Sequence, residues 1–320
     1  MTITMRSLSF CSLLGFVVFC GHSQAQAEPA EMPKTQWAFA NQLALRYNPL
    51  GLQEELYLGY KKKLYDAPSS NLLFGKSYVW SGLITRASPQ FFQGGGFIQT
   101  SPIAVLEINA AFLRTQALTD AGRLPSYYTQ GTQDAVKRTA SSRSPNGDII
   151  GSGWQASVQG RLQAKVGPIA IRSTHLFRYF ELTLEGDRLQ QDLFYDQTLD
   201  VLTPFKSWVY QNDNDLLYAD DNNPWVLGAR YTYVSPLTEV TQPEVDADAL
   251  YSIHRAGLLF AWKFDAPPED GLEARRRHAL IVLSQWHLSH PYRAGQSMNQ
   301  MIPYFAIVYV LNGRIGSEPE

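Results

Sequence analysis

The stretch WHLSHPYRAG, residues 286–295, carries two side chains that together could do acyl-transfer chemistry. His287 and Ser289 are two residues apart, so in a β-strand both would point to one face with their side chains close together. An imidazole in that position can act as the base that activates a serine hydroxyl, and Asn299 in the following loop could orient it. The competing interpretation is an ordinary polar cluster at the rim of the protein. We favour the polar cluster, because a three-residue pattern without its structural context is weak support for catalysis.

The His-x-Ser spacing of His287 and Ser289 resembles that of outer-membrane phospholipases and lipid A deacylases, which are bacterial β-barrels. The resemblance implies a lipid hydrolase whose pair lies on the outer wall, with an Asn or Glu as the orienting residue. The chain departs from it in two respects. His290 and Pro291 follow the serine where the phospholipases have Asn-Gly, and the alternation around the pair places it inward.

The sequence offers no convincing metal site. His278, His287 and His290 lie close together, but no acidic ligand flanks them. The stretches NDND at 212–215 and DDNN at 220–223 lack the glycine and the terminal glutamate of an EF-hand, so a solvated acidic turn is the preferred interpretation. We therefore expect no metal ion and no other cofactor.

The elements that would carry these side chains show a period of two. In GWQASVQGRLQAKV, residues 153–166, apolar or small residues alternate with polar ones over about twice the length of an ordinary strand. Other segments alternate for about nine to thirteen residues and carry Trp, Tyr or Phe near their ends, which is typical of strands that cross a bilayer. An exported β-sandwich shows the same period with shorter strands and remains the alternative.

The pattern predicts an all-β protein, an antiparallel up-and-down transmembrane β-barrel of about twelve strands, with ten or fourteen as alternatives. If both termini are periplasmic, the turns at 101–103 and 167–168 lie on the periplasmic side, and the long connections 116–152 and 235–251 lie outside. The predicted strands are 37–47, 54–65, 77–87, 92–101, 104–115, 153–166, 169–184, 199–211, 225–234, 252–264, 278–289 and 301–311.

The N-terminus has the features of a cleaved signal peptide. Arg6 precedes a short apolar core at 8–20, and Ala25-Gln26-Ala27 is an A-x-A cleavage pattern. We expect residues 1–27 to be removed and residues 28–320 to form a single barrel domain. A lipoprotein signal centred on Cys20 is the less favoured alternative, since the preceding Phe19 is bulky.

Composition narrows the classes of protein further. Both cysteines lie in the predicted signal peptide, so the mature chain can have no disulfide and no cysteine nucleophile. A net charge of −2 and a pI of about 6.3 give no indication of a nucleic-acid partner.

The inward parity of the predicted strands is strongly basic. Lys61 and Lys63 are among the basic residues assigned to it, and the only acidic ones are Glu55 and Glu107. The other acids, such as Asp213 and Asp215, are assigned to connections. A cationic lumen concentrates anions and disfavours cations. The candidate lumen and solute-binding residues are Arg46, Arg161, Lys165, Arg172, Arg178, Arg230, Arg255 and Lys263.

These observations predict a passive, porin-like channel for small anionic solutes in the outer membrane of a Gram-negative bacterium. A lipid hydrolase using His287 and Ser289 is the second hypothesis, and a non-conducting structural or adhesive barrel is the third. The expected partners are outer-membrane lipid, lipopolysaccharide and small solutes, and we expect a monomer.

Overall fold

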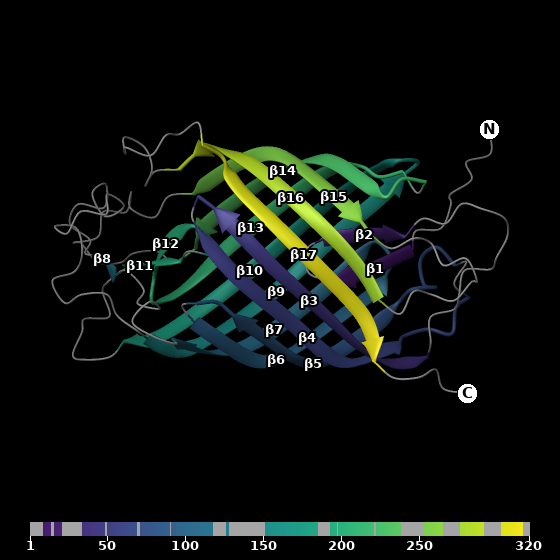
Figure 1. The fold of residues 1–320 in the computed structure, drawn as a ribbon. Coiled ribbons are helices and arrows are strands. Elements are labelled where there is room, and N and C mark those ends of the chain that lie inside the picture. Colours follow the sequence, from purple (N-terminus) through teal and green to yellow (C-terminus); the bar gives the residue numbers. More distant parts are fainter. Residues whose placement is uncertain are drawn as a thin grey trace.

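The computed structural model describes most of the chain, in segments separated by gaps. Within the described residues the wall is a closed antiparallel β-barrel whose strands follow one another around the ring in chain order (Figure 1). The described segments are 9–13, 16–20, 34–48, 50–68, 71–89, 91–117, 126–127, 151–184, 193–196, 198–220, 222–237, 252–264, 276–290 and 302–315.

The prediction of twelve wall strands is confirmed. The last strand pairs with the first from Phe305 opposite Tyr47 to Ile315 opposite Trp37, which closes the ring and leaves no free edge. The wall strands are β3 (Thr35–Tyr47), β4 (Gly51–Lys63), β5 (Tyr78–Ala87), β6 (Phe91–Ile103), β7 (Leu106–Ala117), β9 (Gly151–Val166), β10 (Ile169–Leu184), β13 (Lys206–Tyr218), β14 (Trp225–Pro236), β15 (Ile253–Lys263), β16 (Arg276–Ser289) and β17 (Tyr304–Ile315).

Short strands outside the wall form two small sheets. β1 (Ser9–Leu13) and β2 (Phe16–Cys20) pair with each other within the predicted signal peptide, whose removal stays a prediction. β8 (Ser126–Tyr127), β11 (Leu193–Asp196) and β12 (Val201–Pro204) form a three-stranded sheet. No helix among the described residues is long and apolar enough to span a membrane.

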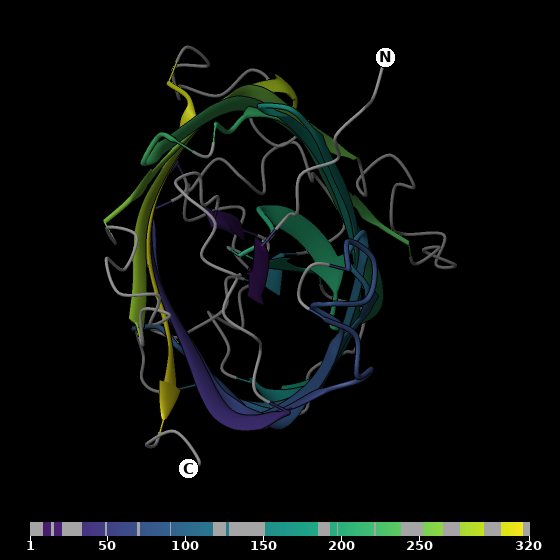
Figure 2. The ribbon, with the colours of Figure 1, turned by 90° about the vertical axis from the view of Figure 1, so that its right-hand side faces the viewer.

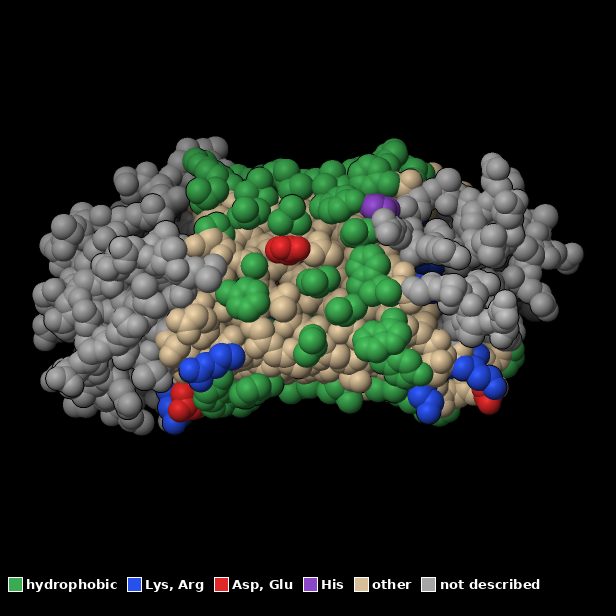
Figure 3. All heavy atoms as spheres, turned by 60° about the horizontal axis from the view of Figure 1, so that its bottom comes forward, with side chains coloured by type: hydrophobic (Ala, Val, Ile, Leu, Met, Phe, Trp, Pro, Cys, Tyr) green, Lys and Arg blue, Asp and Glu red, His purple; other side chains and the backbone are tan. Residues whose placement is uncertain are grey.

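The wall strands have a mostly apolar outer face and a different inner face. In β9, Val158 and Leu162 are 48% and 51% exposed, whereas Arg161 between them in sequence is 1% exposed. Figure 3 shows hydrophobic side chains spread over one side of the wall, with most of the charged side chains near its two ends. The alternation therefore separates a lipid-facing surface from the bore, as a transmembrane barrel requires.

The two ends of the barrel have different connections. The end at which β3 begins and β17 finishes, here called the terminal end, has the short turns 104–105 and 167–168. Gly167 adopts a φ of 58° there, a conformation that glycine accepts without steric cost. The predicted turn at 101–103 was placed too early, because β6 continues to Ile103. The opposite end, here called the loop end, carries the 116–152 and 235–251 connections, most of which lie outside the described residues.

One strand was placed wrongly by the sequence pattern. The prediction of a strand at 199–211 is corrected to β13 (Lys206–Tyr218), with β11 and β12 as separate short strands before it. The NDND stretch resembles a turn by composition, yet it lies in the middle of β13. Polar residues are tolerated in this wall because inward ones meet arginines and hydroxyls, and outward ones hydrogen-bond to one another.

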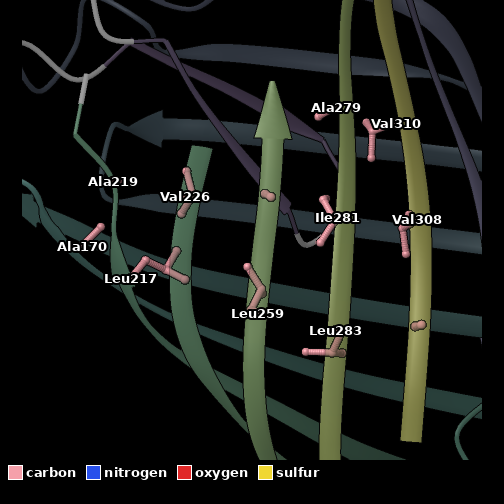
Figure 4. Packing of buried hydrophobic residues seen from close by; sticks show 12 residues of the cluster. Ala170, Leu217, Ala219, Val226, Leu259, Ala279, Ile281, Leu283, Val308 and Val310 are labelled. Atoms are coloured by element: carbon pink, nitrogen blue, oxygen red, sulfur yellow. The ribbon is translucent and has the colours of Figure 1, made fainter. Parts of the chain in front are cut away.

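The bore is lined by two apolar regions as well as by charges. Leu217, Leu259, Ile281 and Val308 belong to an aliphatic cluster on neighbouring strands from β13 to β17 (Figure 4). On the other side, Tyr57, Trp80 and Phe97 pack edge-on or tilted with ring centroids 4.7 to 5.8 Å apart. Inward side chains of both kinds are almost completely buried, so the bore is filled over much of the wall.

Candidate functional site

The structure places every candidate lumen residue on the inner parity of its strand. Arg46, Lys165 and Lys263, close to strand ends, are partly exposed. The others are buried, with at most 8% of their surface accessible: Arg161, Arg172, Arg178, Arg230 and Arg255.

Asp215 joins two of these arginines in a buried ion-pair triad. Arg230 Nε lies 2.7 Å from Asp215 Oδ1, and Arg172 Nε lies 2.6 Å from Oδ2. The three residues come from β14, β13 and β10, which are adjacent in the ring. One carboxylate therefore neutralises part of the charge of two guanidinium groups in a site that water hardly reaches.

Two further pairs lie on the inner face. Glu107 accepts hydrogen bonds from Arg161 and, at 2.9 Å, from Tyr78 Oη. Arg86 Nε is 3.1 Å from Glu55 Oε1. Sequence analysis missed Arg86, although its position in the predicted strand 77–87, opposite Glu55 in the register, was the available signal.

The inner face is therefore less basic than the sequence predicted. Asp213 and Asp215 were assigned to a connection, but the true position of β13 directs both into the bore. Asp213 accepts a 2.6 Å hydrogen bond from Thr232 Oγ1, and Asp215 holds the triad. Cations still outnumber acids among the described inward residues, but most of the deeply buried cations are paired.

Positive charge gathers at the terminal end instead. Inward positions at or next to the ends of β4, β9, β15, β16 and β17 all carry Lys or Arg. We call this group the basic ring. Two of its members were missed, because the predicted strands 278–289 and 301–311 stopped short of them. The basic ring consists of Lys63, Lys165, Lys263, Arg277 and Arg314.

At the loop end, a segment folds back against the inside of the wall. Leu199, Val201 and Phe205 belong to one buried cluster with Phe180 of β10 and with the inward side chains of β13, β14 and β15. Across the bore, Arg46 Nη1 of β3 donates a 2.9 Å hydrogen bond to the Thr198 carbonyl. Figure 2, a view along the barrel, shows short strands inside the ring of wall strands. The folded-back segment 198–205 therefore narrows the loop end.

Asp200 holds this segment through an ion pair with Arg255 and a contact with His290. Its Oδ2 lies 3.2 Å from His290 Nε2 and 3.6 Å from Arg255 Nη1. Asp200 itself is buried and adopts a φ of 60°, a conformation that aspartate tolerates better than most residues. The contacts connect the segment to β15 and to the end of β16.

Asp200, His287 and His290 also place potential ligand atoms within 4.8 Å of one another. Sequence analysis found no acidic residue near these histidines, and the fold brings one from a distant part of the chain. Two imidazoles and a carboxylate are suitable ligands for Zn²⁺. The Arg255 guanidinium opposes such an ion, since its repulsion of a divalent cation at 4 Å is roughly 2 kcal/mol even in bulk water. We therefore interpret the cluster as an ionic anchor for the folded-back segment.

The predicted pairing of His287 with Ser289 is wrong. The register between β15 and β16 shifts, so that His287 lies opposite Arg255, Ser289 lies opposite His254, and Leu288 has no opposing residue. This bulge breaks the period of two. His287 keeps the inward direction of Arg255, whereas Ser289 is exposed on the side of His254, whose ring bonds to outward Tyr231.

The orienting residue of that predicted pair, Asn299, lies outside the described residues. Because His287 and Ser289 point to opposite faces of β16, the backbone of the strand separates the Ser289 hydroxyl from the His287 imidazole. Among the described residues, the strand does not bring the Ser289 hydroxyl and the His287 imidazole together.

No known protein family and no curated protein matches the chain. Solved structures with similarity include OmpT, an outer membrane protein of Vibrio cholerae, with 8% identity over 90% of this chain and 100% of that one, at a TM-score of 0.35. The translocator domain of the autotransporter NalP from Neisseria meningitidis has 9% identity over 88% and 89% of the two chains, at 0.38. A Pseudomonas aeruginosa FadL homologue has 11% identity over 87% and 75%, at 0.38.

Likeness at this level shows no shared function. The class of the protein follows from its own strand pairing: a closed twelve-strand antiparallel barrel with an apolar outer surface, which is the architecture of bacterial outer-membrane β-barrels.

Proposed function

We propose that this barrel is a narrow passive channel of the bacterial outer membrane that prefers small anionic solutes. The observation that carries the proposal is the basic ring at the terminal end. Cationic groups around a mouth with low-dielectric walls raise the local concentration of anions and oppose the entry of cations.

The state of the inward acids supports the same preference. Glu55, Glu107 and Asp215 each contact an arginine, and Asp200 contacts Arg255 and His290. Their negative charges are thus compensated within the wall. The basic ring adds further inward positive charge at the terminal end.

The burial of the inner face supports a narrow channel. Trp80, Arg161 and Asp215 are nearly inaccessible, and the folded-back segment 198–205 covers part of the loop end. Side chains can fill much of a barrel of this size. We expect unit conductance far below that of a wide, water-filled porin.

The orientation in the membrane follows from the connections. In bacterial barrels the short turns are periplasmic and the long loops extracellular, so we place the terminal end in the periplasm and the loop end outside. The apolar outer face would contact lipid and lipopolysaccharide, and a closed wall without a free edge is compatible with a monomer.

Ion selectivity in planar bilayers tests the proposal. The purified protein should conduct in a KCl gradient with a reversal potential of the sign for Cl⁻ preference. The triple substitution Lys63→Glu, Lys165→Glu and Lys263→Glu should shift the reversal potential toward cation preference, because it inverts charges of the basic ring.

Lys62 provides a matched control. It is the neighbour of Lys63 on β4 but is exposed on the outer parity, so Lys62→Glu should leave the reversal potential unchanged. Cation preference in the unmodified protein would contradict the proposal. A correctly folded protein without conductance would favour the structural or adhesive barrel instead.

A further inference from the structure

A polar cluster interrupts the lipid-facing surface of β10 and β13. Ile171 and Leu216 on one side of it, and Phe177 on the other, are exposed apolar residues of the outer face. Polar groups on such a face are costly unless they are hydrogen-bonded, and within membranes they often mark functional sites. The residues between the apolar positions are Ser173, His175, Asn212 and Asn214.

Ser173 and His175 have the geometry of a hydroxyl and its base. They are two apart on β10 without a register shift, so they share the outer face. Ser173 Oγ lies 3.1 Å from His175 Nε2. This is the relation that sequence analysis sought at His287 and Ser289 and that the bulge prevents there.

The other side of the imidazole is held by β13. His175 Nδ1 lies 2.7 Å from the Tyr210 hydroxyl, and the two rings stack with centroids 6.1 Å apart. When Nδ1 donates its hydrogen to the Tyr210 oxygen, the lone pair of Nε2 faces the serine hydroxyl. Nucleophile, base and orienting group are then in line.

Amides from β13 surround the nucleophile. Asn212 Nδ2 lies 3.4 Å from Ser173 Oγ and is fixed by donating to the Thr174 carbonyl at 3.1 Å. Asn214 Oδ1 accepts a 2.7 Å hydrogen bond from Ser173 Oγ, so the hydroxyl proton points to Asn214 in this structure and must turn toward His175 Nε2 before it can be transferred. Asn214 Nδ2 donates to Asn212. The Asn212 amide therefore lies against both Ser173 and His175, with its Nδ2 3.4 Å from His175 Nδ1.

Space for a substrate exists next to the imidazole. Gly160 of β9 lies directly opposite His175, and a Cβ atom at Gly160 would meet nothing within 4 Å. Its outward neighbours Val158 and Leu162 are exposed. The glycine leaves a gap in the apolar surface, open to the lipid, at the position of the base.

We propose that Ser173 is the nucleophile, and His175 the general base, of a site that cleaves carboxylic esters of membrane lipids. The Ser173 hydroxyl turns from Asn214 to His175 Nε2, and Ser173 Oγ attacks the ester carbonyl carbon as its proton moves to that nitrogen. The carbon–oxygen bond to the alcohol then breaks, and the alcohol leaves with that proton. Water, deprotonated by the same imidazole, hydrolyses the acyl-serine to give a fatty acid and free Ser173. The overall reaction consumes one ester and one water, needs no redox partner, and does not involve the bore.

The test uses the full chain refolded in detergent and mixed with phosphatidylethanolamine vesicles. The unmodified protein should release fatty acid, and a fluorophosphonate probe should label Ser173, as identified by peptide mass spectrometry. Ser173→Ala should abolish both signals. His175→Gln should lower the release rate on the order of 100-fold, the usual contribution of a general base.

Ser289→Ala is the matched control, because Ser289 is also an outward serine of the wall, and the bulge in β16 turns it away from His287. This variant should retain full release. Gly160→Leu should block turnover of long-chain lipid, because the leucine side chain would fill the gap that the lipid needs. A short-chain nitrophenyl ester should still be cleaved, because the substitution leaves Ser173 and His175 unchanged. Folding of each variant is checked by its heat-dependent migration in gels.

Absence of fatty-acid release and of serine labelling in the folded, unmodified protein would overturn the inference. Labelling that persists in Ser173→Ala would overturn it as well. The channel proposal is judged separately, because Ser173→Ala lies on the outer face and should leave conductance unchanged.

Discussion

The inner and outer faces of the same strands obey different rules. On the inner face, charged groups are buried. They are tolerated because residues of opposite charge on neighbouring strands pair with them, as in the triad Arg172–Asp215–Arg230. On the outer face, apolar side chains such as Leu216 are exposed next to those same residues. In this protein a buried residue is therefore not necessarily apolar, and an exposed residue is not necessarily polar. What decides the residue type is whether the side chain faces lipid or the bore.

The largest expected effect comes from breaking a buried inner pair. Asp215→Ala would leave two buried guanidinium groups without their shared carboxylate, and we expect it to lower the free energy of unfolding by about 3–5 kcal/mol. Equilibrium unfolding in urea, with the barrel in lipid vesicles, measures the change. Asp66→Ala, which removes an exposed partner of Lys34, should change the free energy by less than about 0.5 kcal/mol.

A charge on the outer face should have the next largest effect. Leu258 lies in the middle of β15 and is exposed, so Leu258→Lys should cost about 2–4 kcal/mol in the same unfolding measurement, because lysine would face hydrocarbon. Ile315→Lys, on the outer face at the end of β17, should cost about 0–1 kcal/mol. Equal costs for the two substitutions would argue against an apolar belt centred on the wall.

Replacing a glycine by alanine should have a different steric effect on the two faces of the wall. A Cβ at inward Gly82 would run into the carbonyl oxygen of Leu58 on the adjacent strand, so Gly82→Ala should destabilise the barrel by about 1–3 kcal/mol. Outward Gly160→Ala meets open space and should change stability by less than about 1 kcal/mol. A neutral Gly82→Ala would mean that the strands separate easily at this point.

Much of the fold could be predicted from alternation. The strands predicted at 153–166 and 169–184 coincide with β9 and β10 to within two residues, because long runs with a period of two have a single consistent interpretation. The prediction failed at β13, where Asn and Asp resemble a turn by composition and the pairing partners that make them acceptable lie on other strands.

The candidate sites were less accessible to prediction. The inward direction of Arg161 or Arg230 followed from parity, but their partners did not. Ser173 and His175 lie in a correctly predicted strand, and their spacing was an available signal. Asn212 and Asn214, however, lay in a stretch taken for a connection, so the network across β10 and β13 was hidden.

The sequence by itself determined which residues alternate and which face of most strands meets lipid, because these properties depend on neighbours two residues apart in the chain. It predicted about twelve strands, and ring closure in the structure fixed that number. Only the tertiary structure decided that Asp200 meets His290, that Asp215 joins two arginines, and that a bulge at Leu288 separates His287 from Ser289 while Ser173 and His175 stay together. Those contacts depend on strand register and ring closure. Both are set by the pairing of residues far apart in the chain, which no local pattern encodes.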